Sequence, residues 1–192
     1  MTEQARETIT DPRALRALSH PTRWTIIELL GLEDTATATR CAEYAGESVA
    51  SCSYHLSMLA KYGFVEQVES SGRERPWRLV SRDQSWAPRE LDGEAALAAE
   101  TLSEVFLDHE NAQIKDWVRR ASREPADWQA AAGMSGRTLH LTAAELTDVR
   151  ERIDALLAPY VDRRDDPARR PAGSRSVRML ITAWLPRTRG GS

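Results

Sequence analysis

The chain has 192 residues, of which 41% are hydrophobic and 29% are charged, and this is enough to bury one modest core or two small ones. Its 26 Lys+Arg and 29 Asp+Glu give a net charge of -3, which excludes a chain-wide positive field that would attract polyanions. A collagen-like, purely coiled-coil or wholly disordered chain is excluded as well.

Cysteine count and hydropathy bear on where the protein works. Two cysteines make no disulfide framework. No apolar run reaches the roughly 18 residues of a membrane span, and the opening segment MTEQARETIT lacks the apolar run of a signal peptide. We therefore expect a cytoplasmic protein with no membrane partner.

The first 46 residues predict three short helices. Asp11 followed by proline is typical of a helix start, because Asp caps the first turn and proline fits its first position. A second helix is predicted over PTRWTIIELL, with an apolar stripe of period 3.6 and its end at Gly31. A third helix fits residues 39–45 and ends at Gly46.

The segment Ser48–Tyr62 predicts a helix with two different faces, closed by Gly63. At 100° per residue, one arc is apolar and the other is mostly small and polar. The apolar arc holds Val49, Cys52, Leu56 and Leu59, and the other holds Ala50, Ser51, Tyr54, Ser57, Met58 and Lys61. We expect the apolar arc to face the core and the other to be exposed.

Two strands are predicted next, over residues 64–69 and 76–80, around a turn at 70–75 that carries arginines. Two short helices joined by a tight turn, followed by a two-stranded ribbon, are the outline of a winged helix-turn-helix. The expected wing covers about Glu66–Val80.

The second half begins with a long predicted helix over residues 91–123. Its apolar stripe is broad and long, and one small domain cannot cover it alone. A second copy of the helix in a two-fold homodimer would cover it. The stripe consists of Ala95, Ala98, Leu102, Val105, Phe106, Trp117, Val118 and Ala121.

Beyond this helix the pattern predicts a strand over 137–141, a helix that begins at a Thr142–Glu145 capping box, a charged linker over 162–176 and a buried strand over 176–185. The predicted fold class is mainly α with a small β part (α+β). Residues 1–90 would form the winged helix-turn-helix domain. Residues 91–192 would form a helical dimerisation region with a short two-stranded element.

The phrases LRALSHPTRWTIIELL and SVASCSYHLSMLAKYGFVEQVESSGRERPWRLV together carry a family pattern. Over residues 11–82 the chain resembles the ArsR-type winged helix-turn-helix transcriptional regulators. The matching residues are His20, Pro21 and Arg23 upstream, and Ser53, His55, Leu56, Leu59, Gly63 and Val65 in and after the recognition helix. The resemblance implies a homodimeric repressor or activator that binds double-stranded DNA, with repression as the expected mode.

In such a regulator the helix Ser48–Tyr62 enters the major groove and the wing touches the backbone or minor groove. Hydroxyl and ammonium groups can bind bases and phosphates, and arginine suits a narrow minor groove. We place Ser53 and His55 at the edges of the exposed face, and Arg23 and Arg78 as weaker candidates. The expected DNA-binding residues are Ser51, Ser53, Tyr54, His55, Ser57, Lys61, Arg73 and Arg75.

Charge counts against strong DNA binding, because residues 1–90 hold 11 Lys+Arg and 13 Asp+Glu. Phosphate contacts dominate affinity, so we expect weak non-specific binding and a need for dimerisation. The alternative is a winged-helix module that docks another protein without direct DNA binding. No catalytic motif supports an enzyme.

Four sets of side chains have both a functional and a structural interpretation. We interpret Cys41 and Cys52 as core residues, and Asp108–Glu110 as a solvated charged face without metal-ligand spacing. We expect capping or packing roles for His20 and His140. We expect neither a metal nor a cofactor. Trp117, Trp128 and Trp184 are the candidate pocket for a small-molecule effector, and core packing is the favoured alternative.

Overall fold

The computed structural model describes residues 8–69, 75–82, 84–86 and 91–187. The chain divides into two compact units, Met1–Ser122 and Arg123–Ser192, named here the N-terminal unit and the C-terminal unit. The long helix α5, Gly93–Arg120, belongs to the N-terminal unit because it packs against the first two helices. Packing thus divides the chain after Ser122, while the functional boundary after residue 90 stays a prediction.

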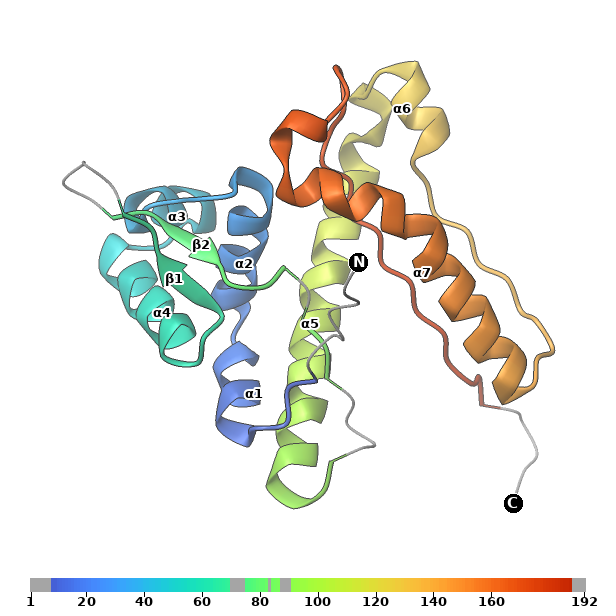
Figure 1. The fold of residues 1–192 in the computed structure, drawn as a ribbon, viewed down its shortest axis with the longest axis horizontal. Coiled ribbons are helices and arrows are strands. Elements are labelled where there is room, and N and C mark those ends of the chain that lie inside the picture. The colour runs from blue at the N-terminus through green and yellow to red at the C-terminus, as the bar shows by residue number, and fades with distance from the viewer. Residues whose placement is uncertain (1–7, 70–74, 83, 87–90, 188–192) are drawn as a thin grey trace. The chain divides into compact units, whose positions relative to one another are not determined.

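The first two helices, α1 (Pro12–Leu18) and α2 (Pro21–Glu33), each begin with proline after a capping side chain (Figure 1). Asp11 Oδ1 accepts a hydrogen bond from the Arg13 N–H at 2.9 Å, which confirms the predicted cap. His20 Nδ1 accepts from the Thr22 N–H at 3.2 Å, so its predicted capping role is confirmed. The expected end of α2 at Gly31 is wrong.

The next two helices are α3 (Ala38–Ala45) and α4 (Val49–Lys61), capped by Thr37 and Ser48. Between them Gly46 has φ +67°, a left-handed conformation that glycine adopts without strain. This turn brings α3 and α4 together as a helix-turn-helix pair. Gly63 follows α4 at φ +76° and turns the chain into the hairpin, as predicted.

The hairpin is shorter than predicted: β1 covers Val65–Gln67 and β2 covers Trp77–Leu79. The strands are antiparallel, with Val65 opposite Leu79 and Gln67 opposite Trp77. Trp77 also exchanges two backbone hydrogen bonds with Ala36, at 2.8 and 3.0 Å. The wing is therefore attached to the chain just before α3.

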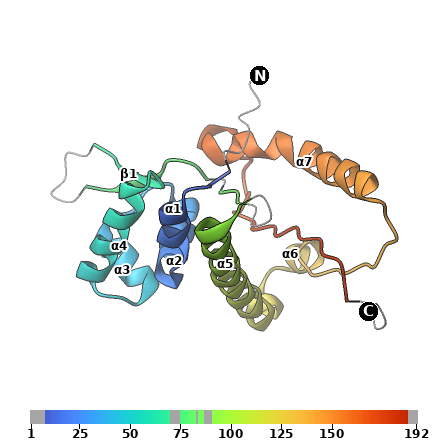
Figure 2. The same ribbon diagram turned by 90° about the horizontal axis from the view of Figure 1, so that it is seen from below.

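The core of the N-terminal unit lies around α1 and α2, which are placed between α5 on one side and α3 and α4 on the other (Figure 2). Each fully buried leucine or isoleucine here stabilises the fold by roughly 1.5–3 kcal/mol relative to exposure. The largest fully buried side chains are Leu15, Leu18, Ile26, Leu29, Leu30, Leu56, Leu59, Leu102, Val65, Cys41 and Cys52.

Aromatic rings and one carboxylate attach α5 to α2. The Phe106 ring lies 5.0 Å from that of Trp24 and 5.4 Å from that of Trp86, and the Trp86 Nε1–H donates to Ser103 Oγ at 2.8 Å. Glu28 accepts from Gln113 at 2.9 Å and lies 3.0 Å from His109 Nε2. These contacts explain why α5 packs with the N-terminal unit.

The C-terminal unit contains α6 (Ala126–Ala131), α7 (Ala143–Asp165) and a short 3-10 turn at Pro167–Arg169. A second 3-10 turn, Ala121–Arg123, spans the boundary between the two units. The capping box before α7 is confirmed, since the Glu145 N–H donates to Thr142 Oγ1 at 3.2 Å and the Thr142 N–H donates to Glu145 Oε2 at 2.8 Å. The helix extends into the predicted linker.

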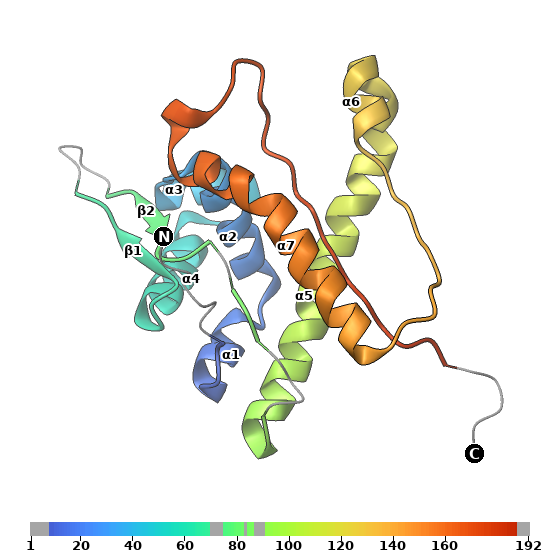
Figure 3. The same cartoon turned by 45° about the vertical axis from the view of Figure 1, so that its right-hand side comes forward.

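Both strands predicted for the second half are wrong. Residues 137–141 and 176–185 form neither strand nor helix, and Figure 3 shows the segment after α7 as an extended trace. A strand needs a hydrogen-bonded neighbour, and β1 and β2 pair only with each other in the sheet that the described residues form.

The fold class is mainly α with a small β part, as predicted: the helices α1–α7 are accompanied by one two-stranded antiparallel sheet. In the part of the chain that the structure describes, no helix combines the length and the apolarity that crossing a membrane would require.

Candidate nucleic-acid interface

Helix α4 has one face inside the protein and one outside. Cys52, Leu56 and Leu59 are all 0% exposed, which confirms the predicted core face. On the opposite side Tyr54 is 59% exposed, and Ser53, Ser57 and Lys61 are exposed too. Ser51 and Met58 are half-buried. The helix therefore presents hydroxyl and ammonium groups to solvent along its length.

Two assignments on α4 are wrong. Val49, expected in the core, is 46% exposed. His55, expected at the edge of the exposed face, is only 7% exposed. Its side chain turns toward α2, where His55 Nδ1 accepts from the Arg23 Nε–H at 3.3 Å. A buried histidine that holds an internal partner is not available to contact DNA, so the exposed set is smaller than predicted.

His20, Arg23 and His55 form one cluster among α1, α2 and α4. The two imidazole rings lie 4.4 Å apart, and the Arg23 Nη1–H donates to the Ala17 carbonyl at 2.6 Å. Burial, followed by the nearby charge of Arg23, lowers the pKa of His20 below its ordinary value. Burial, followed by His20 and then Arg23, lowers the pKa of His55. The cluster thus favours neutral imidazoles, which can act as acceptors.

The exposed side chains of α4 are little used by the fold. The Tyr54 ring touches the edge of His55 at 5.4 Å between centroids, and Ser57 Oγ donates to the Ser53 carbonyl at 2.8 Å. Lys61 Nζ lies 5.6 Å above the Tyr62 ring and makes no ion pair with a described residue. These groups can therefore bind a ligand without breaking a salt bridge.

The wing adds two described arginines, of which one has no ion-pair partner among the described residues. Arg75 is exposed and makes no ion pair with a described residue. Arg78, a weaker candidate, donates to Glu66 at 2.7 Å across the hairpin, so its charge is locally compensated. Arg73 lies outside the described residues.

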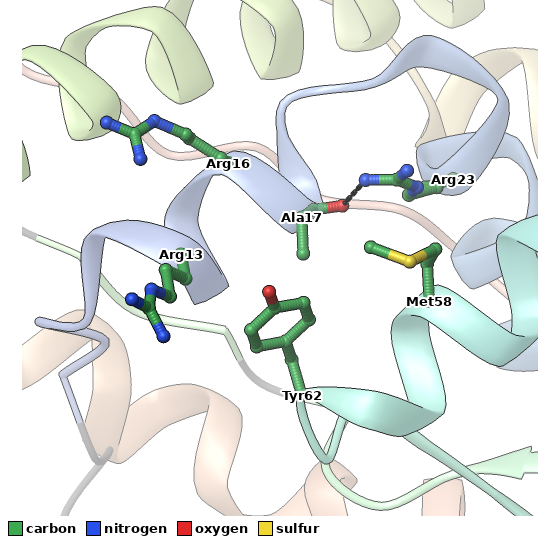
Figure 4. Close-up of a pocket in the computed structure, with 6 residues that line it drawn as sticks. All are labelled: Arg13, Arg16, Ala17, Arg23, Met58 and Tyr62. Carbon is green, nitrogen blue, oxygen red and sulfur yellow. Dashed lines mark hydrogen bonds between the residues drawn. The ribbon is translucent and has the colours of Figure 1, made fainter.

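Sequence reasoning missed a hollow beside α4. It is open to solvent, has a volume of about 440 Å³ and lies between α1 and the C-terminal end of α4 (Figure 4). Only the packing of α1, α2 and α4 brings these residues together, although the two arginines three positions apart on α1 were a visible signal. The lining residues are Arg13, Arg16, Ala17, Arg23, Met58 and Tyr62.

The cysteines are core residues, as predicted. Cys41 is 1% exposed and Cys52 is 0% exposed. Burial raises the pKa of the Cys41 thiol to about 11, and it raises that of Cys52 as well. Both thiols are thus held protonated and unreactive.

The expectation of a solvated face at Asp108–Glu110 is wrong for two of its three residues. Glu110 is 5% exposed, and the His109 side chain is 11% exposed where it meets Glu28. Within the described ranges, no three His, Cys, Asp or Glu side chains gather as a metal site. His140 is exposed.

The three tryptophans of the candidate effector pocket lie in different units. Trp117 is half-buried on α5 in the N-terminal unit, whereas Trp128 and Trp184 belong to the C-terminal unit. The Arg175 guanidinium lies 5.0 Å from the Trp128 ring, and Trp184 is 77% exposed. The preferred interpretation of all three as core residues is therefore wrong for Trp184, and the effector pocket stays a prediction.

Comparisons with known proteins give weak likenesses to solved structures. No family model and no curated protein matches this chain. Among solved structures, a doubly substituted variant of Lactococcus lactis ZitR is similar at 15% identity and a TM-score of 0.32, over 73% of this chain and 75% of that one. The apo form of that variant is similar at 15% identity and a TM-score of 0.33, over 74% of this chain and 83% of that one. A likeness at this TM-score carries no conclusion about function.

Proposed function

We propose that this chain is a homodimeric, sequence-specific DNA-binding transcriptional regulator. Helix α4 enters the major groove, and the wing lies on the backbone or minor groove. The observation that carries the proposal is the two-sided α4, whose inner face is fully buried while Tyr54, Ser57 and Lys61 remain exposed. A helix-turn-helix that displays such a face has the shape and the groups that fit a major groove.

The chemistry of this face predicts how the DNA is read. Serine and tyrosine hydroxyls and one ammonium group can bind base edges or phosphates, but α4 carries no arginine, the residue that most often reads guanine. Specificity therefore depends largely on DNA shape and on the wing. In the wing Arg75 is exposed, and Arg73 is a DNA-binding candidate from the sequence alone.

The residues that match the ArsR-type pattern support the proposal because they connect α1, α2 and α4. His20 caps α2, Arg23 reaches back to α1, and His55 receives the Arg23 N–H from α4. The pattern thus encodes how α4 is seated on the first two helices. We propose that the chain is an ArsR-like regulator on this ground, with repression as its mode.

The homodimer is supported by apolar surface on α5. Leu97, Leu107 and Val118 are 65%, 45% and 49% exposed. Exposed apolar groups along a long helix favour a partner surface, and two-fold pairing would place two α4 helices on half-sites about 34–36 Å apart. Light scattering should give a dimer at micromolar concentration. A stable monomer would contradict this part of the proposal.

The test of DNA binding uses the only two lysines in the chain, which form a matched pair. Affinity for an operator-bearing duplex should fall linearly with salt on a log–log plot. Lys61→Ala should weaken binding and reduce the slope by about 0.9 per subunit. Lys115→Ala, on the exposed surface of α5, should change neither.

The alternative is a winged-helix module that docks another protein. The observation that favours it is the net acidic balance of residues 1–90, with 11 Lys+Arg and 13 Asp+Glu. In that case duplex binding would be weak, and Lys61→Ala would match Lys115→Ala. The same titration therefore separates the two functions.

A further inference from the structure

The hollow between α1 and α4 has an electrostatic feature that the fold does not explain. Arg23 lines it, and this side chain is only 7% exposed. Its hydrogen-bond partners are the carbonyl oxygen of Ala17 and Nδ1 of His55, and neither partner is a carboxylate. No described carboxylate forms an ion pair with it. A guanidinium cannot lose its charge near neutral pH, so the charge is buried without a counter-ion.

A second guanidinium on the same hollow has no internal partner either. The backbone N–H of Arg13 binds Asp11, but the Arg13 side chain makes no hydrogen bond or ion pair with a described residue. Figure 4 shows the Tyr62 side chain directed into the space between Arg13 and Ala17, with Met58 beside Arg23. The hollow thus combines two uncompensated cations with a phenol.

Arg16 contributes less to the positive potential of the hollow. It forms an ion pair with Glu94 at the start of α5, and both side chains are more than half exposed. Removing the Glu94 charge would release Arg16 toward any anion in the hollow. This pair therefore provides a way to raise the positive potential without touching the residues that hold the fold.

We propose that this hollow is a binding site for a phosphate group, with Arg13 and Tyr62 as direct ligands and Arg23 as the buried cation. Guanidinium groups match phosphate oxygens with paired N–H donors, and an anion here would supply the missing counter-charge. Two sources carry the same group: a backbone phosphate of bound DNA, or a free phosphate compound. The DNA source rests on the proposed function, and the site itself does not.

The first experiment needs no DNA. The thermal midpoint Tm of the full chain is measured in inorganic phosphate and in sodium chloride of equal ionic strength. At about five times its dissociation constant, phosphate should raise the Tm by about 2–4 °C. Arg13→Gln and Tyr62→Phe should each reduce this rise. Arg150→Gln, an exposed arginine on α7 without a described ion pair, is the matched control and should keep it.

Glu94→Gln provides a test in the opposite direction, because it should make phosphate binding tighter than in the unsubstituted protein. A Tm that is no higher in phosphate than in chloride would overturn the proposal. So would a rise that Arg13→Gln leaves intact.

The second experiment identifies the source of the phosphate. If it belongs to DNA, Arg13→Gln should reduce the salt slope of duplex binding by about 0.9 per subunit, while Arg150→Gln leaves it unchanged. An unchanged slope, together with phosphate binding that still depends on Arg13, would assign the site to a free phosphate compound. Phosphate binding in a protein that binds no duplex would confirm the site and remove the proposed function.

Discussion

The two units of this chain differ in how far they bury their apolar side chains. In the N-terminal unit, α1, α2, α4 and α5 direct leucines and isoleucines into one core. In the C-terminal unit, no described residue is buried, and Leu156, Trp184 and Leu185 are 72%, 77% and 92% exposed. Both units carry helices with good local signals. The difference shows that caps and periodicity suffice to form a helix, whereas a core also needs facing surfaces.

Hydrogen exchange should show the largest contrast. Amides of α2 and α4 should exchange only through opening that approaches global unfolding, about 5–15 kcal/mol for an ordinary domain. Amides of α7 should exchange through local opening of much lower free energy, because none of the side chains described on that helix is buried. Mass spectrometry of the peptides measures both. Equal protection in α7 would mean that its apolar side is covered in the assembled protein.

A pair of leucine truncations should separate the units next most strongly. Leu30→Ala, at a side chain that is 0% exposed, should lower the free energy of unfolding by about 2–5 kcal/mol through lost burial and a cavity. Leu156→Ala should change it by less than about 0.5 kcal/mol. Urea unfolding of both variants measures the difference. Similar losses at the two sites would break the comparison.

Local features of both units could be predicted from the sequence. Helix starts at Asp11 and Thr142 followed from local capping chemistry and were found in both units. The inner face of α4 followed from its period of 3.6. Val49 was wrongly placed in the core. It is the first residue of α4, and the period of the helix does not show whether other elements extend far enough to cover that end.

Features that depend on distant partners were not predictable. His55 was placed at the edge of the exposed face because of its angle on the helix, and only the fold shows that Arg23, thirty-two positions away, donates a hydrogen bond to it. The strands over 137–141 and 176–185 had suitable composition, but pairing is a non-local requirement that composition does not encode. The hollow beside α4 likewise needs α1, α2 and the end of α4 to bring its arginines and its phenol together.

A pH titration should reveal the histidine cluster of the N-terminal unit. Lowered pKa values for His20 and His55 mean that the unfolded chain binds more protons than the folded one below about pH 6.5. Stability is therefore full above this pH and falls as the pH drops toward the folded-state pKa values. Arg23 and Glu47 are the charged groups that act on both rings, with opposite effects, and the Tyr54 phenol packs against His55.

Asparagine substitutions make this titration specific, because the Asn Oδ1 can replace Nδ1 as an acceptor but does not titrate. His20→Asn and His55→Asn should each flatten the loss of thermal stability between about pH 7 and 5.5. His20→Asn also keeps a good helix cap. His140→Asn, in the C-terminal unit, is the control. An unaltered pH profile in both cluster variants would show that other groups cause the acid loss.

The smallest expected effect compares two helix caps of similar chemistry. Asp11→Ala removes the acceptor for the Arg13 N–H and should cost about 1 kcal/mol of global stability, because α1 packs in the core. Thr142→Ala removes the capping box of α7 and should reduce local helix content while leaving the main unfolding transition unchanged. Far-UV circular dichroism during urea unfolding measures both. A shift of the main transition by Thr142→Ala would show that α7 unfolds together with the N-terminal core.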